Sequence, residues 1–236
     1  MNNSTILIKI RQRLNKLSSN DYDNIQDWMV VEAFNKGMAD WCRRNLHGTN
    51  MKNEGDEQST SRIDDLQSLL VPLPIPSMIN RNTFYETQND KPADYLRFKR
   101  ISAKATSECC PEAKPLKIYL AEEANVDLLL ADENKKPSFE WAETFATFVG
   151  NKLRIYTNGS FDITDVRLMY YRQPRRIQIA GITDPYTGLI PTTNVPCEFN
   201  DDLIELLVDE AAKIIAGDIE SWGQFDRGTK SAETNN

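Results

Sequence analysis

The sequence predicts an α+β protein in which a helical bundle from both chain termini carries an inserted antiparallel β-sheet or sandwich domain. Three observations point to this class. Apolar residues recur with helical spacing near both ends, the middle contains short segments of alternating apolar residues, and a proline-rich run separates the first helical part from that middle. The expected division is 1–70 for the N-terminal helical part, 71–199 for the β-rich domain, and 200–236 for a C-terminal helix that packs on the N-terminal helices and ends in a polar tail.

The N-terminal part begins with a short amphipathic helix, with Ser4 or Thr5 near its start. Basic and apolar residues interleave here, without the continuous apolar segment of a secretory signal, so we expect the helix to remain in the mature protein. Its apolar stripe consists of Ile6, Ile8, Ile10, Leu14 and Leu17.

A second, long helix is expected over residues 20–46. Asn20 is a suitable N-cap, Asp23 supports it three residues later, and Gly48 fits a helix stop. Because its stripe includes two tryptophans and a phenylalanine, this helix requires a large partner surface, inside this chain or on a neighbouring subunit. The stripe follows three- and four-residue steps through Ile25, Trp28, Val31, Phe34, Met38, Trp41 and Asn45.

The chain after this helix is polar over residues 49–61, which indicates an exposed loop. Pro72, Pro74 and Pro76 then alternate with apolar residues. Proline lacks the backbone donor that a helix or a central strand needs. These prolines therefore predict an extended, edge-like segment and a domain boundary.

Several short strands are expected in the middle of the chain, with a short helix over residues 122–134 between two of them. The turn signal at Thr157–Ser160 predicts a hairpin between residues 153–156 and 161–163. Turn signals at roughly 8–12 residue spacing favour an antiparallel sandwich or sheet. The strand candidates are residues 96–106, 115–121, 143–150, 151–159 and 165–174.

Residues 184–196 form a loop rich in proline, glycine and threonine, after which helical periodicity resumes. Asp202 and Glu205 stand in capping-box spacing, and acidic residues cluster in the first turn, where the helix dipole favours them. The polar end of the chain, residues 222–236, is expected to be loose. One face of the helix carries Leu203, Leu207, Ala211, Ile214 and Ile219.

The chain has 236 residues and a net charge of −7. This length is enough for one large domain or two small ones with a sizeable core. No apolar stretch approaches the roughly 18 residues of a membrane span. The acidic charge argues against stable nucleic-acid binding by the whole surface, because gripping phosphates needs a basic surplus. It allows an acidic wall past which DNA slides.

No metal ligand, cofactor-binding residue or catalytic residue is expected. Cys42, Cys109, Cys110 and Cys197 match no zinc spacing, and Cys42 lies beside the stripe as a small buried apolar residue. No Walker, Rossmann, G-x-S-x-G or H-E-x-x-H pattern occurs.

The chain is also expected not to be an enzyme. His47 is the only histidine, so a histidine-activated nucleophile would need it, but its place at a helix C-terminus is explained by the helix dipole. Carboxylate pairs serve glycosidases when their side chains converge. Among 35 acidic residues such pairs also arise by chance, and here they are Glu122–Glu123, Asp64–Asp65, and Glu140 with Glu143.

Residues 170–176, Tyr-Tyr-Arg-Gln-Pro-Arg-Arg, form the densest basic and aromatic cluster. Such a cluster suits stacking on bases, or binding of a sugar or an acidic protein. The simpler interpretation, which we favour, is a strand end with one tyrosine buried and the arginines in surface ion pairs.

Five runs of the sequence together resemble structural proteins of crAss-like tailed phages of gut bacteria. They are residues 27–46, 53–67, 138–159, 170–181 and 207–221. The order of helices, β part and final helix is similar to that of head-to-tail adaptor or tubular tail proteins of short-tailed phages. The resemblance covers most of residues 20–231. It rests on these runs, contains no catalytic signature, and transfers no functional residue.

This resemblance implies a virion protein of the tail or head-tail connector, assembled in the host cytoplasm as a ring of about twelve copies between portal and tail. Its partners would be copies of itself, the portal protein and neighbouring tail or ring proteins. Double-stranded DNA would pass transiently without specific binding, and no membrane is involved. Residues 49–61 and the tail after Arg227 would order on contact with neighbours.

Two other function classes remain open. One is a carbohydrate- or protein-binding module with a β-domain on a helical stalk, suggested by Trp141, Tyr156, Tyr170 and Tyr171. The other is an enzyme that uses carboxylates alone, which requires two converging carboxylates in a cleft.

Overall fold

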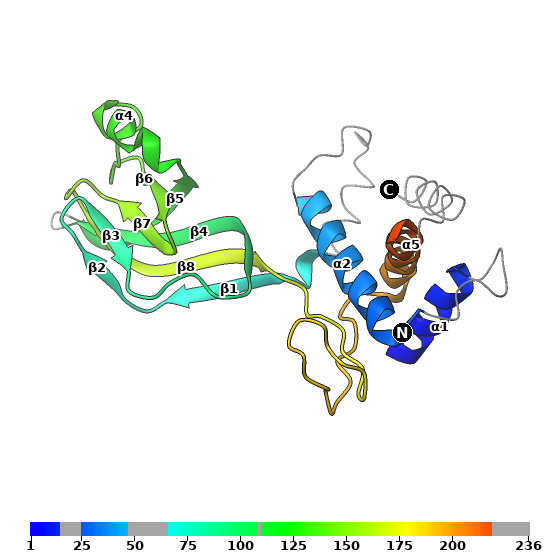
Figure 1. The fold of residues 1–236 in the computed structure, drawn as a ribbon. Helices are drawn as coiled ribbons and strands as arrows, with labels where there is room; N and C mark the ends of the chain where they lie inside the picture. The colour runs from blue at the N-terminus through cyan, green and yellow to red at the C-terminus, as the bar shows by residue number, and fades with distance from the viewer. Residues whose placement is uncertain (15–24, 47–65, 108–109, 219–236) are drawn as a thin grey trace. The chain divides into compact units, whose positions relative to one another are not determined.

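The computed structural model describes residues 1–14, 25–46, 66–107 and 110–218, and the chain divides into two compact units (Figure 1). Unit 1 contains Met1–Ser68 and Pro174–Asn236, and unit 2 contains Leu69–Gln173. Residues 174–199, which were expected in the β-rich domain, thus belong to the unit that holds the terminal helices. The polar loop 49–61 and residues 222–236 lie outside the described residues.

Unit 1 is built around α5, Asp201–Asp218, which contacts both α1, Asn3–Leu14, and α2, Asp27–Leu46 (Figure 1). Helices α1 and α2 touch each other little. Helix α2 packs on α5 around Gly37, where an added Cβ would be in ordinary van der Waals contact, 3.5 Å from Cβ of Glu210. Of the apolar face predicted for α5, Leu203, Leu207 and Ala211 are buried, Ile214 is half-buried, and Ile219 lies outside the described residues.

Charged residues flank the contact between α1 and α5. Lys9 pairs with Glu205, and Arg13 reaches Asp209 at 2.7 Å. The apolar side of α1 buries Ile6, Ile10 and Leu14, as expected. Ile8 does not belong to that stripe, because two residues past Ile6 a helix has turned by about 200°. Its side chain is 57% exposed.

Helix α2 begins later than predicted. Residues 25 and 26 are not helical, so the helix starts at Asp27, and the expected cap at Asn20 lies outside the described residues. The two tryptophans of the predicted stripe differ in burial. Trp41 is 4% exposed and packs edge-on against Phe199 with ring centroids 5.9 Å apart, whereas Trp28 is half-buried and donates its indole N–H to Gln26.

Unit 2 contains one curled sheet of eight strands in the order β1-β8-β4-β5-β6-β7-β3-β2 (Figure 1). All neighbouring pairs are antiparallel except β5 and β6, which are parallel and joined through η1, Glu123–Asn125, and α4, Val126–Ala131. The strands are β1 Leu70–Ile75, β2 Met78–Asn80, β3 Phe84–Thr87, β4 Tyr95–Ser107, β5 Cys110–Leu120, β6 Glu143–Val149, β7 Lys152–Tyr156 and β8 Asp162–Arg172.

The predicted architecture, a terminal helical bundle with an inserted antiparallel sheet or sandwich, is therefore wrong, although the chain is α+β. The β part is a single mixed sheet with a helical crossover of its own, and the helices of unit 1 flank α5 instead of forming a regular bundle. The physical reason is the segment 122–134. It was recognised as a short helix, and η1 and α4 confirm this, but a helix between two strands favours parallel pairing.

The sheet curls because its two edge strands are consecutive in the chain. Only Pro76 and Ser77 separate β1 from β2, yet these strands lie at opposite ends of the strand order. The curl encloses a core in which Ala105, Leu153 and Leu168 are almost fully buried. Where the two edges approach, the sheet has a seam.

The edge character that the prolines predict is confirmed for β1. Leu69 O accepts from Arg172 N, and Leu70 faces Tyr171 in the register with β8. By the alternation of an antiparallel ladder, the nitrogens of Pro72 and Pro74 point away from β8. Proline at these positions costs no ladder bond and removes donors from the free edge.

The predicted hairpin around Thr157–Ser160 is wrong. The turn exists, with positive φ at Asn158 and Gly159, but β7 pairs with β6 and β3 while β8 pairs with β4 and β1. The backbone N–H groups of Thr157 and Asn158 donate to Thr83 O, so the turn is joined to the chain before β3. The turn reverses the chain without pairing its two flanks.

Candidate interaction surfaces

A loop of unit 1, residues 179–194, is anchored at its base by two asparagines. We call it the tip loop. Its flanks form the antiparallel bridge Gln178↔Val195, and Asn3 of α1 donates to both carbonyls, at 3.0 and 2.8 Å. Asn35 of α2 clamps the neighbouring Ile177, accepting from its N–H at 2.9 Å and donating to its carbonyl at 3.2 Å. Two helices thus hold the base.

The end of the tip loop is ordered by bonds of its own. Asp184 and Gly188 close a tight turn, with Gly188 N donating to Asp184 O at 2.8 Å and Gly188 at φ +67°. The Tyr186 N–H donates to the Asp184 carboxylate, which holds the pKa of that carboxyl below its ordinary value. The Arg176 guanidinium lies over the Tyr186 ring. The loop is therefore shaped before any partner arrives.

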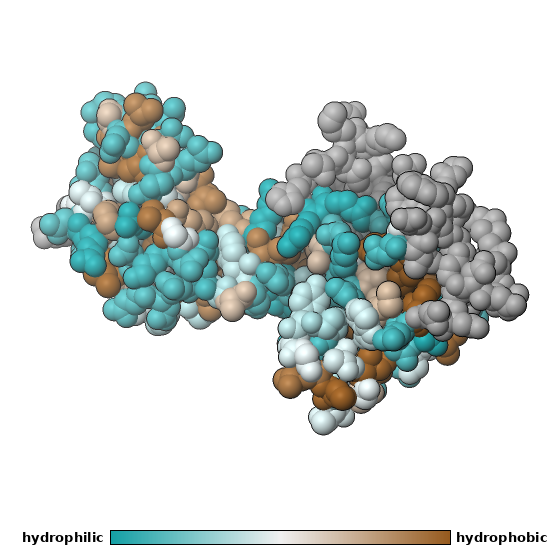
Figure 2. All heavy atoms as spheres, viewed as in Figure 1, coloured by the Kyte–Doolittle hydropathy of each residue, from teal (hydrophilic) through white to brown (hydrophobic). Residues whose placement is uncertain are grey.

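This ordered loop exposes large apolar side chains. Leu189 is 70% exposed, Ile190 is 62% exposed and Tyr186 is 57% exposed. Figure 2 shows apolar groups in brown at the end of the loop that Figure 1 draws in yellow and orange. Grouped exposed apolar side chains of this kind mark sites of interaction.

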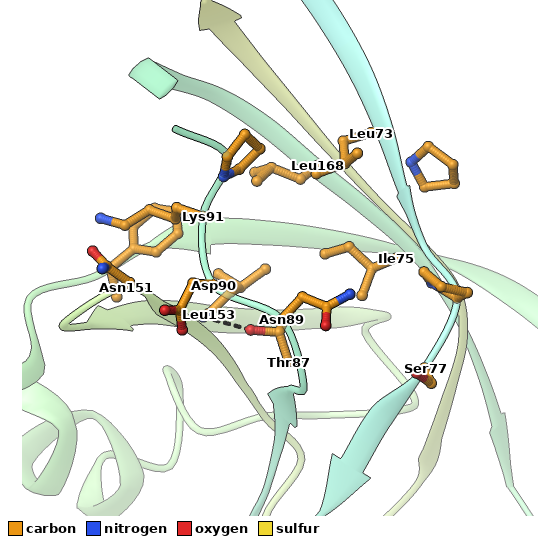
Figure 3. Close-up of a pocket in the computed structure, with 14 residues that line it drawn as sticks. Leu73, Ile75, Ser77, Thr87, Asn89, Asp90, Lys91, Asn151, Leu153 and Leu168 are labelled. Carbon is orange, nitrogen blue, oxygen red and sulfur yellow. Dashed lines mark hydrogen bonds between the residues drawn. The ribbon is translucent and has the colours of Figure 1, made fainter. Parts of the chain in front are cut away.

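An apolar pocket lies at the seam of the curled sheet in unit 2 (Figure 3). We call it the seam pocket, and its volume is about 90 Å³. Its lining combines aliphatic side chains from β1, β7 and β8 with the chain that connects β3 to β4. The lining residues are Leu73, Pro74, Ile75, Pro76, Ser77, Thr87, Asn89, Asp90, Lys91, Pro92, Phe148, Asn151, Leu153 and Leu168.

The rim of the seam pocket is held in place by hydrogen bonds. Lys91 N donates to Asn151 O at 2.8 Å, and the Lys91 ammonium lies 4.7 Å from the centre of the Phe148 ring. The Thr87 hydroxyl accepts from Leu153 N at 3.1 Å (Figure 3). Asp90 is exposed at this rim. The pocket is thus preformed, with an apolar floor and an acidic group at its mouth.

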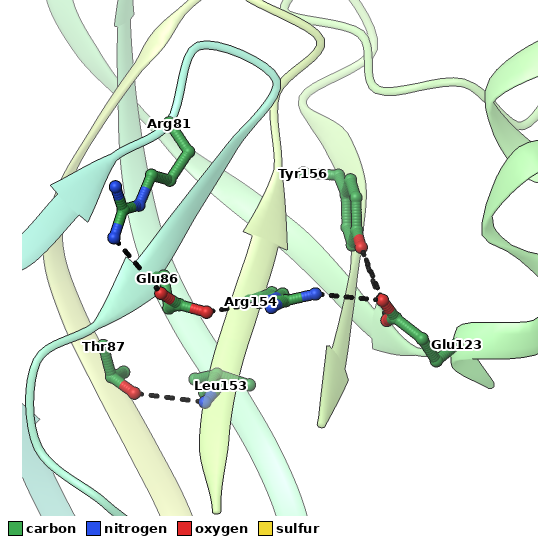
Figure 4. A network of polar contacts seen from close by, with 7 residues as sticks. All are labelled: Arg81, Glu86, Thr87, Glu123, Leu153, Arg154 and Tyr156. Carbon is green, nitrogen blue, oxygen red and sulfur yellow. Dashed lines mark hydrogen bonds and ion pairs between the residues drawn. The ribbon is translucent and has the colours of Figure 1, made fainter. Parts of the chain in front are cut away.

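A chain of charged groups crosses the outer side of β3 and β7 (Figure 4). Arg154 bridges two carboxylates, Glu86 at 2.9 Å and Glu123 at 3.2 Å, and Tyr156 donates to Glu123 at 3.3 Å. Arg81 also reaches Glu86, at 3.9 Å. The hydrogen bond from Arg154 lowers the pKa of Glu86, and the bond to Glu86 raises the pKa of Arg154. Both carboxylates are engaged by a cation, so the network joins strands to η1.

A second exposed apolar group surrounds α4. Trp141 is 77% exposed and Leu128 is 71% exposed. Trp141 borders an open hollow of about 750 Å³ together with Tyr119 and polar groups that include Glu133 and Asn134. An exposed indole beside amide and carboxylate groups is a surface on which a sugar ring or an apolar peptide side chain can stack.

The structure separates the aromatic residues that suggested ligand binding. Tyr170 and Tyr171 are 3% and 6% exposed, and the Tyr170 hydroxyl donates to Asp94. Tyr156 is also buried. Of the proposed aromatic set only Trp141 reaches the surface. The basic end of the same cluster, from Pro174 onwards, belongs to unit 1, where the Arg175 N–H donates to Glu198.

Some of the residues considered for catalysis or metal binding lie near one another in the described part of the chain: Cys42 is close enough to Cys197 to interact electrostatically, and Glu140 and Glu143 line the same hollow as Trp141. His47 and the Asp64–Asp65 pair lie outside the described residues, as does Cys109. Cys42 is fully buried, as predicted, and this burial raises the pKa of its thiol to about 12. No cluster of three metal-ligating side chains occurs within the described ranges. Across the same ranges, no helix has the length and apolar content of a membrane span.

No protein-family model matches this chain, and no curated protein matches it either. The tip loop and the seam pocket therefore stand on their geometry alone. Sequence reasoning described residues 184–196 only as a loop. The signal it passed over was the apolar pair Leu189–Ile190 inside a polar turn.

Proposed function

We propose that this protein is a virion structural subunit that assembles into a ring in the portal-to-tail connector or tail barrel of a tailed phage, around a channel for DNA. The observation that carries the proposal is the tip loop. It is anchored by Asn3 and Asn35, ordered by its own hydrogen bonds, and yet exposes Leu189 and Ile190. A loop built in this way is suited to a partner that buries those side chains.

The place of the ring in a virion is supported by the resemblance of the five sequence runs to structural proteins of crAss-like phages. The net charge of −7 suits a DNA channel, since a ring multiplies the field of one subunit by its copy number. An acidic or neutral wall lets a duplex slide, whereas a basic wall retains it through counterion release.

Native mass spectrometry and light scattering of the full chain, alone and with the portal protein of the same phage, test the proposal. We expect a ring-sized species of about twelve copies, free or on the portal. Fluorescence anisotropy with duplex DNA should show binding no tighter than about 1 μM at physiological salt. A chain that stays monomeric alone and with the portal contradicts the proposed function.

A second candidate function, binding of a carbohydrate or a protein segment, is favoured by Trp141 and its neighbouring hollow. Glycan arrays followed by titration calorimetry test it. A specific sugar whose binding is lost in Trp141→Ala, while Trp28→Ala retains it, would support this function. The absence of a bound glycan leaves the ring as the better account.

A further inference from the structure

The tip loop and the seam pocket are opposite in shape and alike in chemistry, and each lies in a different unit of the chain (Figures 2 and 3). We infer that the tip loop of one copy docks on the seam pocket of the next copy, with Leu189 seated between β1 and the chain that connects β3 to β4. This inference rests on the proposed ring and names the contact that closes it.

The size of the seam pocket suits one aliphatic side chain. Its volume is about 90 Å³. For scale, an enclosed cavity of about 150 Å³ lined by Leu, Ile and Phe holds a benzene molecule. A smaller pocket with Leu153 and Leu168 at its floor and Leu73 and Ile75 on its wall therefore accepts the branched end of a leucine.

Leu189 is the tip residue best placed to enter. It follows Gly188, whose positive φ turns the chain, and it is the most exposed of the three apolar tip residues. Its backbone carbonyl is already used, because Asp184 N donates to it at 2.9 Å. Insertion of the side chain therefore leaves the loop backbone undisturbed.

Each surface carries one group of each sign. Asp90 and Lys91 line the mouth of the seam pocket, whereas Arg176 lies against Tyr186 of the tip loop and acts electrostatically on Asp184 of the same loop. Opposite charges can therefore face each other across the contact. Docking brings a cation near a carboxylate, which fixes the orientation of the contact as well as adding attraction.

Both surfaces are preformed, so little conformational entropy is lost when they meet. The tip is held by Asn3 and Asn35, and the pocket by the Lys91–Asn151 and Thr87–Leu153 hydrogen bonds. A contact between two different surfaces of identical copies is heterologous. Such contacts generate closed rings when the rotation between copies closes, and open filaments when it does not.

Photo-crosslinking tests the contact directly. Ile190, which is 62% exposed beside Leu189, is replaced by benzoylphenylalanine so that Leu189 itself is kept. Copies labelled with heavy nitrogen are mixed with unlabelled copies before assembly and irradiation. We expect crosslinked peptides that join position 190 of one isotope to residues 73–77 or 87–92 of the other. Crosslinks within one isotope only, crosslinks to another surface, or none at all would each overturn the inference.

Variants separate this contact from the proposed function. Leu189→Asp should weaken self-association about tenfold or more, because a charged group replaces a buried apolar one. Ile8→Asp, at a 57% exposed position on α1 outside both candidate surfaces, is the matched control and should assemble as the wild type does. Asp90→Arg and Arg176→Glu should each weaken assembly, and the double variant should restore it.

The two failures are distinguishable. If both the wild type and Leu189→Asp form rings, only the docking of the tip loop is contradicted. Wild-type protein without any ring, and without crosslinks between isotopes, contradicts the ring itself. Circular dichroism of each variant shows whether the fold is intact, and the crosslink map of the wild-type background remains decisive if one variant misfolds.

Discussion

The buried face of α2 and the exposed end of the tip loop use the same kind of side chain for opposite purposes. Trp41 and Phe34 are almost fully buried, and Trp41 packs on Phe199. Leu189 and Ile190, in the same unit, are mostly in water although hydrogen bonds order their loop. Apolar content alone does not tell folding from assembly. What separates the two regions is whether the chain supplies its own partner surface.

The largest expected effect lies on the buried side of this comparison. Trp41→Ala should cost about 3–5 kcal/mol of unfolding free energy, because it leaves a cavity against Phe199. Urea unfolding followed by circular dichroism measures it. Trp141→Ala, at a 77% exposed position, is the matched control and should change the unfolding free energy by less than about 0.5 kcal/mol. Equal losses in both variants would break the comparison.

A smaller loss of unfolding free energy is expected at Asn35, through which α2 holds the base of the tip loop. Asn35→Ala removes the partner of both backbone groups of Ile177, which is 1% exposed. Leaving these groups buried and unpaired should cost on the order of 2–3 kcal/mol. Hydrogen exchange should show faster exchange of the Ile177 amide than in the wild type. If the amide stays as protected as in the wild type, α2 does not hold the base of the tip loop.

The charged network of Glu86, Arg154 and Glu123 in unit 2 differs from both regions, because its stability should depend on pH. The folded-state pKa of Glu86 lies below its ordinary value of 4.5, chiefly because Arg154 donates a hydrogen bond to it. Its stabilising contribution is therefore complete above about pH 4.5 and is lost as the pH falls through the lowered folded-state pKa. The difference in melting temperature between the wild type and Glu86→Gln should be larger at pH 7 than at pH 3. A difference that does not change with pH would contradict this.

The smallest effect on stability is expected at the tip. Leu189→Asp should change the unfolding free energy of the monomer by no more than about 0.5 kcal/mol, since Leu189 is already 70% exposed. Thermal melting of dilute protein measures this, apart from any assembly. A clear loss of stability would mean that the side chain packs within its own chain, and the contrast between the two regions would disappear.

Local features of the fold were predictable because they depend on few neighbouring residues. Pro72 and Pro74 predict an edge strand since the missing donor is a property of the residue itself, and the segment from Glu122 to Asn134 predicts a helix from its own pattern. The hairpin at Thr157–Ser160 failed because the amides of the turn bind Thr83, far away in the sequence.

The candidate surfaces were harder to predict for the same physical reason. The seam pocket is lined by β1, β7, β8 and the chain that follows β3. No local sequence pattern predicts that these segments lie together. The anchoring of the tip loop by Asn3 and Asn35 depends on contacts over 142 to 192 positions. Only the exposed pair Leu189–Ile190 was visible in the sequence, as two large apolar residues in a turn rich in glycine and proline.

The alternating prolines of β1 have a consequence for the synthesis of the chain. Strand β1 leaves the ribosome about 100 residues before β8, the neighbour with which it pairs. At ordinary rates of translation β1 waits roughly 5–20 s without that partner. The proposed ring requires many copies of the chain, so during that wait the same strand is present on other nascent chains. Pro72 and Pro74 remove donors from one side of the waiting strand, and this makes it a poor template for its own copies until β8 arrives.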